Sequence, residues 1–157
     1  ILGIGDRHNG NIMVTNDGHL FHIDFGLFLG NFKSKFGMNR ERAAFVCTPE
    51  MVYAMVGSSD YRTNKYYKEF VEMCVAAFIE IRKYAHELET LFLTMVSAGM
   101  PELLNKQDIL YIRKQLCLDQ TQAQATETFK TELKKAVTST SRKIDNFVHL
   151  VKHSSKA

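Results

Sequence analysis

The hydrophobic pattern of this chain changes once, and the change separates a short β region from a longer helical region. Residues 11–15 and 19–23 are short runs of apolar and β-branched residues. Residues 16–18 (Asn-Asp-Gly) lie between these runs, and an Asp-Gly pair tolerates the positive φ of a tight turn. The pattern therefore predicts a small β-hairpin whose two open ends, at Asn11 and Asp24, come together in space.

From Thr48 onward, apolar residues recur at the spacing of amphipathic helices. Thr48 and Pro49 predict an N-cap followed by a proline at the first helical position, and residues 57–62 end this first helix. A second, longer helix is indicated by apolar residues at intervals of three and four, which are Tyr66, Phe70, Cys74, Phe78 and Ile81, with Tyr67 and Val71 widening the same face.

Four further segments predict the rest of the helical region. They are residues 88–96, a helix capped by Asn105 and Asp108 that carries Ile109, Ile112 and Leu116, residues 121–137, and about residues 142–153. Within residues 121–137 the positions expected to face inward are Ala123, Ala125, Phe129, Leu133 and Ala136. The predicted fold class is mainly α with a small β-hairpin, an α+β arrangement.

The segment between the two regions, residues 26–47, has no clear period and contains Gly30 and Gly37, so it predicts a long loop. A loop of this length is more often functional than idle. Positive charge is concentrated in it between Lys33 and Arg42. The chain as a whole has a net charge of only +3, which is too small to demand a nucleic-acid partner.

Length and composition limit the class of protein further. A chain of 157 residues is one domain or part of one, and its apolar fraction of 45% supplies a core. The 3 cysteines are widely spaced without a C-x-x-C, which indicates reduced thiols of a cytosolic protein. The longest apolar stretch, residues 91–100, is shorter than the roughly 20 residues that span a bilayer, so any membrane contact is expected to be peripheral.

Three polar residues of the β region have the spacing that phosphoryl transfer requires. Asp6 and Asn11 are separated by five positions, and Asp24 begins an Asp-Phe-Gly sequence. Protein kinases hold Mg²⁺ and orient the attacking hydroxyl with a loop Asp, an Asn placed five residues later and the Asp of Asp-Phe-Gly. The loop here reads Asp-Arg-His instead of His-Arg-Asp, which argues against an ordinary protein kinase.

The inverted loop and the segments that follow it resemble the phosphoinositide 3-kinases, in particular their class I members. The resemblance rests on Gly-Asp-Arg-His-Asn-x-Asn-Ile-Met at residues 5–13 and Leu-Phe-His-Ile-Asp-Phe-Gly at residues 20–26, and it continues through residues 36–42, 45–49, 97–103 and 108–113. Relatives that phosphorylate proteins typically carry proline or another residue where Asn9 stands. Asn9 therefore favours the lipid-kinase branch.

The resemblance implies the C-terminal lobe portion of a protein-kinase-like bilobal fold, spanning residues 1–157. Residues 1–26 would form the catalytic loop, the hairpin and the Asp-Phe-Gly segment, residues 27–48 the activation loop, and residues 49–153 the helical lobe. A glycine-rich loop and an ATP-gripping lysine are missing from the sequence, so an N-terminal lobe is expected upstream. Without that lobe the isolated chain is expected to be inactive.

The resemblance also assigns roles in the use of ATP and Mg²⁺. Asp24 is expected to bind Mg²⁺, with Asn11 as the second ligand through its amide oxygen. His8 is expected to take the proton of the attacking hydroxyl while Asp6 orients the loop, and Asp6 is the alternative base. Arg7 is expected to pair with a carboxylate or a backbone carbonyl. The plainer interpretation of Asp24 and Asn11 is that they stabilise turns.

The choice of lipid is expected to depend on the loop after Asp-Phe-Gly. The candidate contacts to headgroup phosphates are Lys33, Lys35, Arg40 and Arg42. Class I members carry two basic clusters here, class II members tend to keep only the second, and class III members have neither. This chain keeps both in weakened form; the alternative is a solvated basic loop. Leu27 stands where many class I members have a histidine, which implies a lower rate or a different substrate class.

The last predicted helix is the candidate membrane contact. Phe147 and Val151 lie on its apolar stripe, and Lys152 is among the basic residues that flank the stripe. Such a helix is typical of segments that lie on an anionic bilayer. Packing of this helix on its own lobe is the alternative.

These patterns predict an ATP-dependent kinase that phosphorylates the 3-hydroxyl of a membrane inositol lipid, with phosphatidylinositol 4,5-bisphosphate as the expected substrate. A related protein Ser/Thr kinase and a pseudokinase scaffold are the alternatives. The resemblance implies a regulatory subunit or a small GTPase as a partner, bound through regions outside this sequence. It also implies a cytoplasmic protein that is recruited peripherally to membranes.

Overall fold

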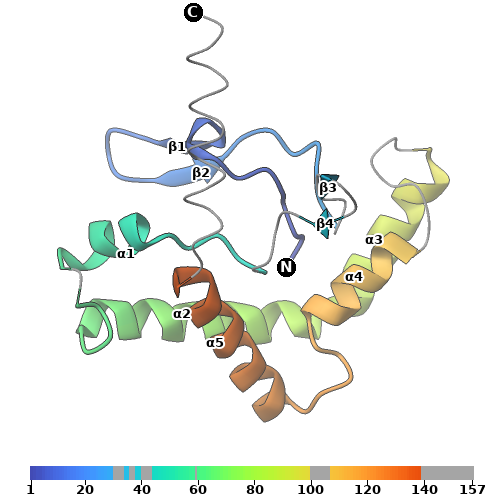
Figure 1. The fold of residues 1–157 in the computed structure, drawn as a ribbon. Coiled ribbons are helices and arrows are strands. Elements are labelled where there is room, and N and C mark those ends of the chain that lie inside the picture. Colours follow the sequence, from blue (N-terminus) through green and yellow to red (C-terminus); the bar gives the residue numbers. More distant parts are fainter. Residues whose placement is uncertain (30–33, 36–37, 40–43, 59, 100–106, 139–157) are drawn as a thin grey trace, which may run out of the picture.

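A computed structural model describes residues 1–29, 34–35, 38–39, 44–58, 60–99 and 107–138 of the chain. Across these ranges the structure is mainly helical, with two small antiparallel sheets of two strands each (Figure 1). The mainly α fold class with a small β-hairpin is therefore confirmed. No helix within these ranges is long and apolar enough to cross a bilayer.

The predicted hairpin is formed by β1 (Ile12–Val14) and β2 (Leu20–His22). Ile12 pairs with His22 and Val14 with Leu20, so the two strands are in register across the tight turn. Gly18 in that turn has a φ of 89°, a conformation that glycine adopts without steric cost. The Ile23 N–H donates to the Asn11 carbonyl at 3.1 Å, which extends the pairing to the open end of the hairpin.

A second, smaller sheet lies in the segment that the sequence predicts to be an irregular loop. β3 (Ser34–Lys35) pairs with β4 (Met38–Asn39) in an antiparallel ladder. The prediction of a loop without strands over residues 26–47 is wrong at this point. Strands of two residues are too short to leave a period in the hydrophobic pattern, so the pattern could not show them.

The first helix, α1 (Pro49–Val56), begins and ends where the sequence predicts. The Thr48 Oγ1 accepts a hydrogen bond from the Met51 N–H at 3.3 Å, and Pro49 occupies the first helical position. At the other end Gly57 adopts a left-handed φ of 70° and donates its N–H to the Tyr53 carbonyl. Local capping chemistry therefore fixes both ends of α1.

The core of the helical part is built where α2 (Lys65–Lys83) crosses α5 (Gln122–Thr138), low in Figure 1. Phe78 of α2 stacks on Phe129 of α5 with ring centroids 4.5 Å apart and an interplanar angle of 19°. Both rings are buried, as predicted. α3 (Ala85–Ser97) follows α2 directly and packs beside α4 (Gln107–Gln115). Ile112 of α4 and Leu116, which follows α4, belong to the same core.

Three predicted core positions are wrong. Tyr66 is 53% exposed because it lies roughly 120° around α2 from the buried Phe78, at 100° per residue. Ile81, at the rim of the same buried face, is 38% exposed. Ala123 is exposed because it lies roughly 200° around α5 from the buried Ala125, on the opposite side of the helix.

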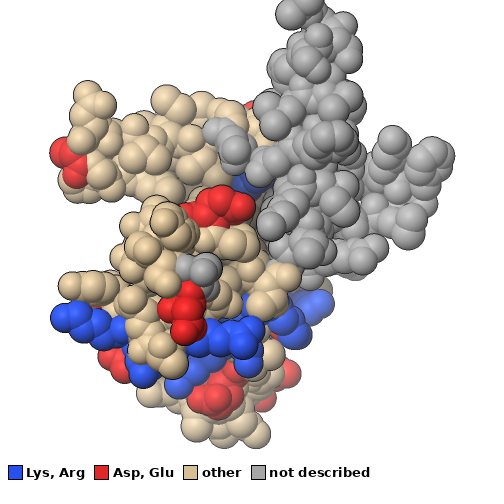
Figure 2. Space-filling model, turned by 60° about the vertical axis from the view of Figure 1, so that its left-hand side comes forward, with Lys and Arg blue, Asp and Glu red and all other residues tan. Residues whose placement is uncertain are grey.

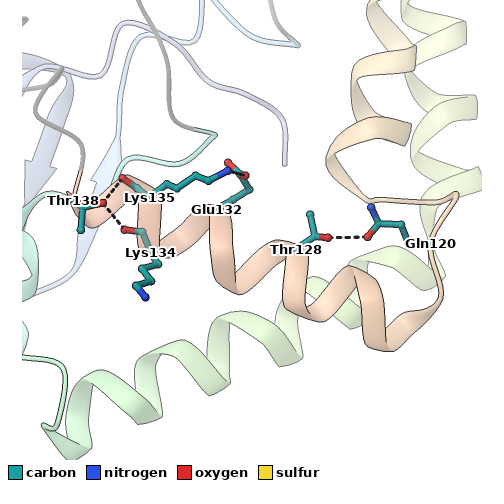
Figure 3. Close-up of polar contacts among 6 residues, drawn as sticks. All are labelled: Gln120, Thr128, Glu132, Lys134, Lys135 and Thr138. Atoms are coloured by element: carbon teal, nitrogen blue, oxygen red, sulfur yellow. Dashed lines mark hydrogen bonds and ion pairs between the residues drawn. The ribbon is translucent and has the colours of Figure 1, made fainter.

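Polar contacts order the outer side of α5 and its entry (Figure 3). The helix begins with a reciprocal pair, in which the Gln124 N–H donates to Thr121 Oγ1 at 3.3 Å and the Thr121 N–H donates to Gln124 Oε1 at 3.0 Å. Further along, Thr128 donates to the Gln120 side chain at 2.8 Å. Lys135 forms an ion pair with Glu132 at 2.7 Å.

Charged side chains are unevenly distributed over the surface. In the face drawn in Figure 2, Lys and Arg gather together with Asp and Glu over the lower part of the molecule, at the height where α2 and α5 lie in Figure 1. Among the residues drawn in colour, those in the upper part of that face are mostly neither basic nor acidic. Positive and negative charges are interspersed over the helical part, so that part has no surface of one sign in this view.

Candidate active site

Arg7 connects the candidate catalytic loop, residues 5–11, to the Asp-Phe-Gly segment. Its side chain is buried, and its guanidinium donates to the carbonyl oxygens of Gly5 at 2.6 Å, of Ile23 at 2.6 Å, and of Asp24. A weaker contact reaches the Asn11 carbonyl at 3.4 Å. The prediction is that Arg7 pairs with a carboxylate or a backbone carbonyl, and its partners are backbone carbonyls. One planar group with five donors thus holds both sides of the candidate site together.

Asn11 lies at the end of a short 3-10 helix (Asn9–Asn11), where the loop enters β1. It is buried, and its Nδ2 donates to the Asp6 carbonyl at 2.9 Å. The amide nitrogen is thereby committed to the loop, which leaves Oδ1 as the atom that can bind a cation. The backbone of Asn11 pairs with Ile23, so the hairpin brings Asn11 next to the residue that precedes Asp24, as predicted.

Asp24 and Asp6 both have left-handed backbone conformations, with φ values of 61° and 54°. Residues other than glycine rarely adopt positive φ, and such residues cluster at functional sites when the surroundings hold them. Here the surroundings are the bonds from Arg7 to Asp24 and to Gly5, the neighbour of Asp6. The Asp24 side chain is exposed, and its Oδ1 accepts a bond from the Gly26 N–H at 3.4 Å.

His8 has a defined orientation at the start of the 3-10 helix. Its Nδ1 accepts a hydrogen bond from the Gly10 N–H at 3.1 Å. A neutral His8 in this arrangement carries its proton on Nε2, which makes Nε2 a donor and not a base. His8 can therefore take a proton from a hydroxyl only after the contact to Gly10 is released.

The segment after Asp-Phe-Gly runs back along the segment that leads into the catalytic loop. The Gly5 N–H donates to the Leu27 carbonyl at 2.7 Å, and the Leu29 N–H donates to the Leu2 carbonyl at 2.8 Å. Leu29 is buried in the core. These two bonds fix the backbone immediately before Asp6 and immediately after Asp24 relative to each other.

One face of the hairpin carries apolar side chains that the sequence analysis did not assign to the site. Met13 and Phe21 are paired across the strands and are each 44% exposed. Ile23 continues this face, because it pairs with Asn11 two residues from Met13. The alternation of these residues along both strands is the signal that could have identified them. They form an apolar surface directly beside the candidate metal ligands.

The opposite face of the hairpin contributes His22, which is half-buried. Burial lowers the pKa of His22, and the positive charge of Arg7 lowers it further. A neutral His22 is therefore favoured behind the loop, where a second positive charge would compete with Arg7.

Several residues expected to contact lipid lie outside the described ranges. These residues are Lys33, Arg40, Arg42, Phe147, Val151 and Lys152, together with the helix predicted at about residues 142–153. Lys35 belongs to β3 by its backbone. Their roles stay predictions.

A catalytic loop bonded to an Asp-Phe-Gly segment and set on a helical base is the arrangement of a kinase C-terminal lobe. Comparison with known proteins agrees with this class. The family model described as phosphatidylinositol 3- and 4-kinase matches residues 1–105, and the chain belongs to this family.

Individual relatives match nearly the whole chain. Phosphatidylinositol 3-kinase 3 of Dictyostelium discoideum is 46% identical over 98% of the chain, and phosphatidylinositol 3-kinase 1 of the same organism is 42% identical over the same share. Phosphatidylinositol 3-kinase C2 domain-containing subunit gamma of Rattus norvegicus is 39% identical over 95%. The chain spans only 9% or 10% of the length of these relatives.

Proposed function

We propose that the protein containing this chain transfers the γ-phosphate of ATP to the 3-hydroxyl of a membrane inositol lipid. The observation that carries the proposal is the set of hydrogen bonds from Arg7 to Gly5, Ile23 and Asp24, which holds the loop with Asp6 against the Asp-Phe-Gly segment. Family membership and the relatives' names support a lipid kinase. Residues 1–157 would be the distal part of the catalytic domain, with an N-terminal lobe upstream.

The residues present fit a magnesium ion. Mg²⁺ prefers one or two carboxylates together with phosphate oxygens, and the open end of the hairpin offers the exposed carboxylate of Asp24 and the amide oxygen of Asn11. Within the described ranges, clusters of three or more His, Cys, Asp or Glu that could hold a metal by themselves do not occur. A bound Mg²⁺ would neutralise charge on the phosphate groups of ATP.

Asp6 and His8 divide the handling of the acceptor hydroxyl. The bond from Gly10 to His8 Nδ1 places the proton of a neutral His8 on Nε2, so His8 is suited to donate toward the transferred phosphate. Asp6 has a left-handed backbone and follows Gly5, whose carbonyl accepts a bond from Arg7. These two features set the backbone position from which the Asp6 carboxylate extends. As the proton acceptor, His8 would first have to release the contact to Gly10, and Asp6 is the alternative acceptor.

The apolar face of the hairpin fits the base of the nucleotide. Met13, Phe21 and Ile23 share this face, and it ends at Asn11, the candidate metal ligand. Planar purine rings bind against apolar side chains, with few polar contacts for orientation. We assign this face to the adenine ring of ATP, so that the phosphates extend toward Asn11 and Asp24.

The lipid headgroup is assigned to the basic loop after Asp-Phe-Gly, through Lys33, Lys35, Arg40 and Arg42. With both basic clusters kept in weakened form, phosphatidylinositol 4,5-bisphosphate is the proposed substrate and class I the proposed class. Phe147, Val151 and Lys152 would lie on the bilayer surface, which makes the protein a peripheral membrane protein. A regulatory subunit or a small GTPase would act through other parts of the protein.

The test uses the full-length protein with ATP, Mg²⁺ and vesicles that contain phosphatidylinositol, its 4-phosphate or its 4,5-bisphosphate. Asp24→Asn is expected to abolish formation of the 3-phosphorylated product. Asp17→Asn makes the same chemical change in the turn of the same hairpin, where the side chain is exposed, and is expected to leave the rate unchanged.

The vesicle that gives the fastest reaction identifies the lipid class. Phosphorylation of a protein substrate with no lipid product would replace the proposal with the protein Ser/Thr kinase alternative. Absence of any ATP consumption by the wild-type protein, with both lipid and protein substrates present, would indicate a pseudokinase.

A further inference from the structure

Gly3 and Tyr111 are 108 positions apart in the sequence and in direct contact in the structure. A Cβ atom built on Gly3 would lie 2.3 Å from Tyr111 Oη, 2.5 Å from Cζ and 2.6 Å from Cε1. Real Cβ atoms essentially never come closer than 3.0 Å, so a side chain at position 3 would require the tyrosine ring or the Gly3 backbone to shift. Gly3 also has a left-handed φ of 55°.

Tyr111 is carried by a helix that is firmly anchored. Ile112 of α4 and Leu116, the first residue after α4, are both 0% exposed in the core. Arg113 of α4 forms a two-pronged ion pair with Glu89 of α3, at 2.9 and 3.0 Å. The Leu116 carbonyl just beyond α4 accepts a bond from Arg82 of α2 at 2.7 Å. The position of Tyr111 is therefore set by three helices.

Gly3 belongs to the segment that determines where the catalytic loop begins. The Leu2 carbonyl and the Gly5 N–H on either side of it are bonded to Leu29 and Leu27, the backbone that follows Asp-Phe-Gly. Asp6 follows Gly5 directly and has its own left-handed backbone. A displacement at Gly3 would therefore pass along a short, bonded stretch of backbone to Asp6 and to the segment after Asp24.

We propose that Tyr111 is a positioning residue for the catalytic loop. It transmits the location of the α3–α4 pair to the loop through its contact with Gly3, without touching the nucleotide or the acceptor hydroxyl. This inference rests on the proposed function only where it relates the position of the loop to the rate of phosphoryl transfer. The contact between the ring and Gly3, and its effect on the loop backbone, can be tested without any turnover.

The kinetic test uses the full-length protein, four single variants and one double variant. Gly3→Ala is expected to lower kcat at least about tenfold with the KM for ATP within about threefold, because small misplacements of catalytic groups have large effects. Gly57→Ala is the matched control: Gly57 has a φ of 70° and nothing within 4 Å of its built Cβ, so this variant has the backbone strain alone. Its kcat is expected to stay within about twofold of the wild type, like that of most surface changes.

Two changes at Tyr111 complete the set. Tyr111→Leu removes the contact with Gly3, so kcat is expected to fall. Because this variant lacks the three atoms that collide with a Cβ at position 3, adding Gly3→Ala to it is expected to lower kcat by less than about threefold more. Tyr111→Phe keeps the ring carbons and is expected to retain kcat within about threefold. Losses that multiply in the double variant, or a Gly57→Ala loss as large as that of Gly3→Ala, would overturn the proposal.

Hydrogen exchange gives a result that is independent of activity. In Tyr111→Leu the amides of Gly5 and Leu29, which are bonded across the loop, are expected to exchange faster while the amides of α5 exchange at the wild-type rate. Equal acceleration throughout the helical part would mean that Tyr111 supports only overall stability, and the proposal would be withdrawn. If the wild-type protein phosphorylates no lipid, the proposed function fails, and the exchange of Gly5 and Leu29 still decides the role of Tyr111.

Discussion

Arg7 and Arg82 make the same kind of contact in two different regions of the molecule: each guanidinium donates to several backbone carbonyls. Arg7 donates to the carbonyls of Gly5, Ile23 and Asp24 in the catalytic region. Arg82 donates to the carbonyls of Leu116 at 2.7 Å, Cys117 at 3.0 Å and Gln120 at 2.9 Å, in the turn between α4 and α5. In each case one of the bonded residues is a left-handed residue other than glycine, because Asp24 has a φ of 61° and Cys117 a φ of 50°.

The two regions differ in what else holds them. Around Arg82, Leu116 is fully buried and Cys117 is buried, so apolar packing supports the same backbone that the guanidinium bonds. Around Arg7, the hairpin side chains Met13 and Phe21 are nearly half exposed, so the loop depends on polar bonds. We infer that the helical region is stable by packing, whereas the catalytic region is shaped by a few directed hydrogen bonds that make it sensitive to single substitutions.

The largest expected effect comes from replacing Arg7. Arg7→Lys keeps the charge, but an ammonium group is a point and cannot reach the carbonyls of Gly5, Ile23 and Asp24 together. Each buried carbonyl left without a donor costs roughly 1–3 kcal/mol, and the loop shifts to relieve it. We expect kcat of the full-length protein to fall by about 100-fold or more in steady-state assays with lipid vesicles.

The matched change, Arg82→Lys, breaks the same kind of contact in the packed region. Its kcat is expected to remain within about threefold of the wild type, because Ile112 and Leu116 still hold α4. Amides near Gln120 are expected to exchange faster with solvent. Equal losses of kcat in the two variants would contradict the division between a packed and a hydrogen-bonded region.

The second expected effect is on the packed side. Phe129→Ala removes the ring that stacks on Phe78 at 4.5 Å, and the opening free energy of α2 and α5 is expected to fall by about 3–5 kcal/mol. Native-state hydrogen exchange in the full-length protein measures this value. Tyr66→Ala is the control on the exposed side of α2 and is expected to change the opening free energy by less than about 0.5 kcal/mol.

The same experiment tests the separation of the two regions. The Ile23 amide, which donates to Asn11 at the open end of the hairpin, is expected to keep its exchange rate in Phe129→Ala. Faster exchange at Ile23 would show that the catalytic region depends on the helical core after all.

The sequence predicts the features that are determined by neighbouring residues. The hairpin around Gly18 and the limits of α1 at Thr48 and Gly57 follow from turn and capping chemistry. The burial of Phe78 and Phe129 follows from the helical period. The helical period also led to the wrong prediction that Tyr66 is buried, because an aromatic residue on the exposed side of α2 can fit the same spacing of three or four.

The remaining features depend on contacts between distant parts of the chain. Arg82 reaches carbonyls 34 to 38 positions away, and Tyr111 meets Gly3 across most of the sequence, so the local sequence contains no sign of either contact. In the candidate site, motif spacing selected Asp6, His8, Asn11 and Asp24, and their roles stay predictions. The tautomer of His8 and the positive φ of Asp6 required the structure.

A third, smaller effect concerns the reactivity of a buried thiol. Burial raises the pKa of Cys47 to about 11, and the nearby Cys74 contributes to the shift. Thiolate is the form that reacts with alkylating agents, so Cys47 in the folded protein is expected to react with iodoacetamide at pH 8 on the order of 10- to 100-fold more slowly than in the unfolded chain. Mass spectrometry of the alkylated peptides measures both rates. Equal rates would show that the residues around Cys47 do not protect its thiol in the folded protein.

The smallest expected effect is a pH dependence at the boundary between the two regions. The pKa of His22 in the folded protein is lowered from its ordinary value of 6.5, by burial first and by Arg7 second. The unfolded chain therefore binds a proton at a pH where the folded protein does not, so stability rises with pH. The contribution of His22 is fully present above about pH 6.5 and is lost as the pH falls through the lower pKa of the folded state.

Hydrogen exchange of the Ile23 amide between pH 5 and 7.5, corrected for the intrinsic pH dependence of exchange, measures this contribution. His22→Gln is expected to remove the residual pH dependence, whereas His86→Gln, the same change at an exposed position on α3, is expected to leave it unchanged. A residual dependence that survives His22→Gln would mean that another group near Arg7 titrates with the hairpin.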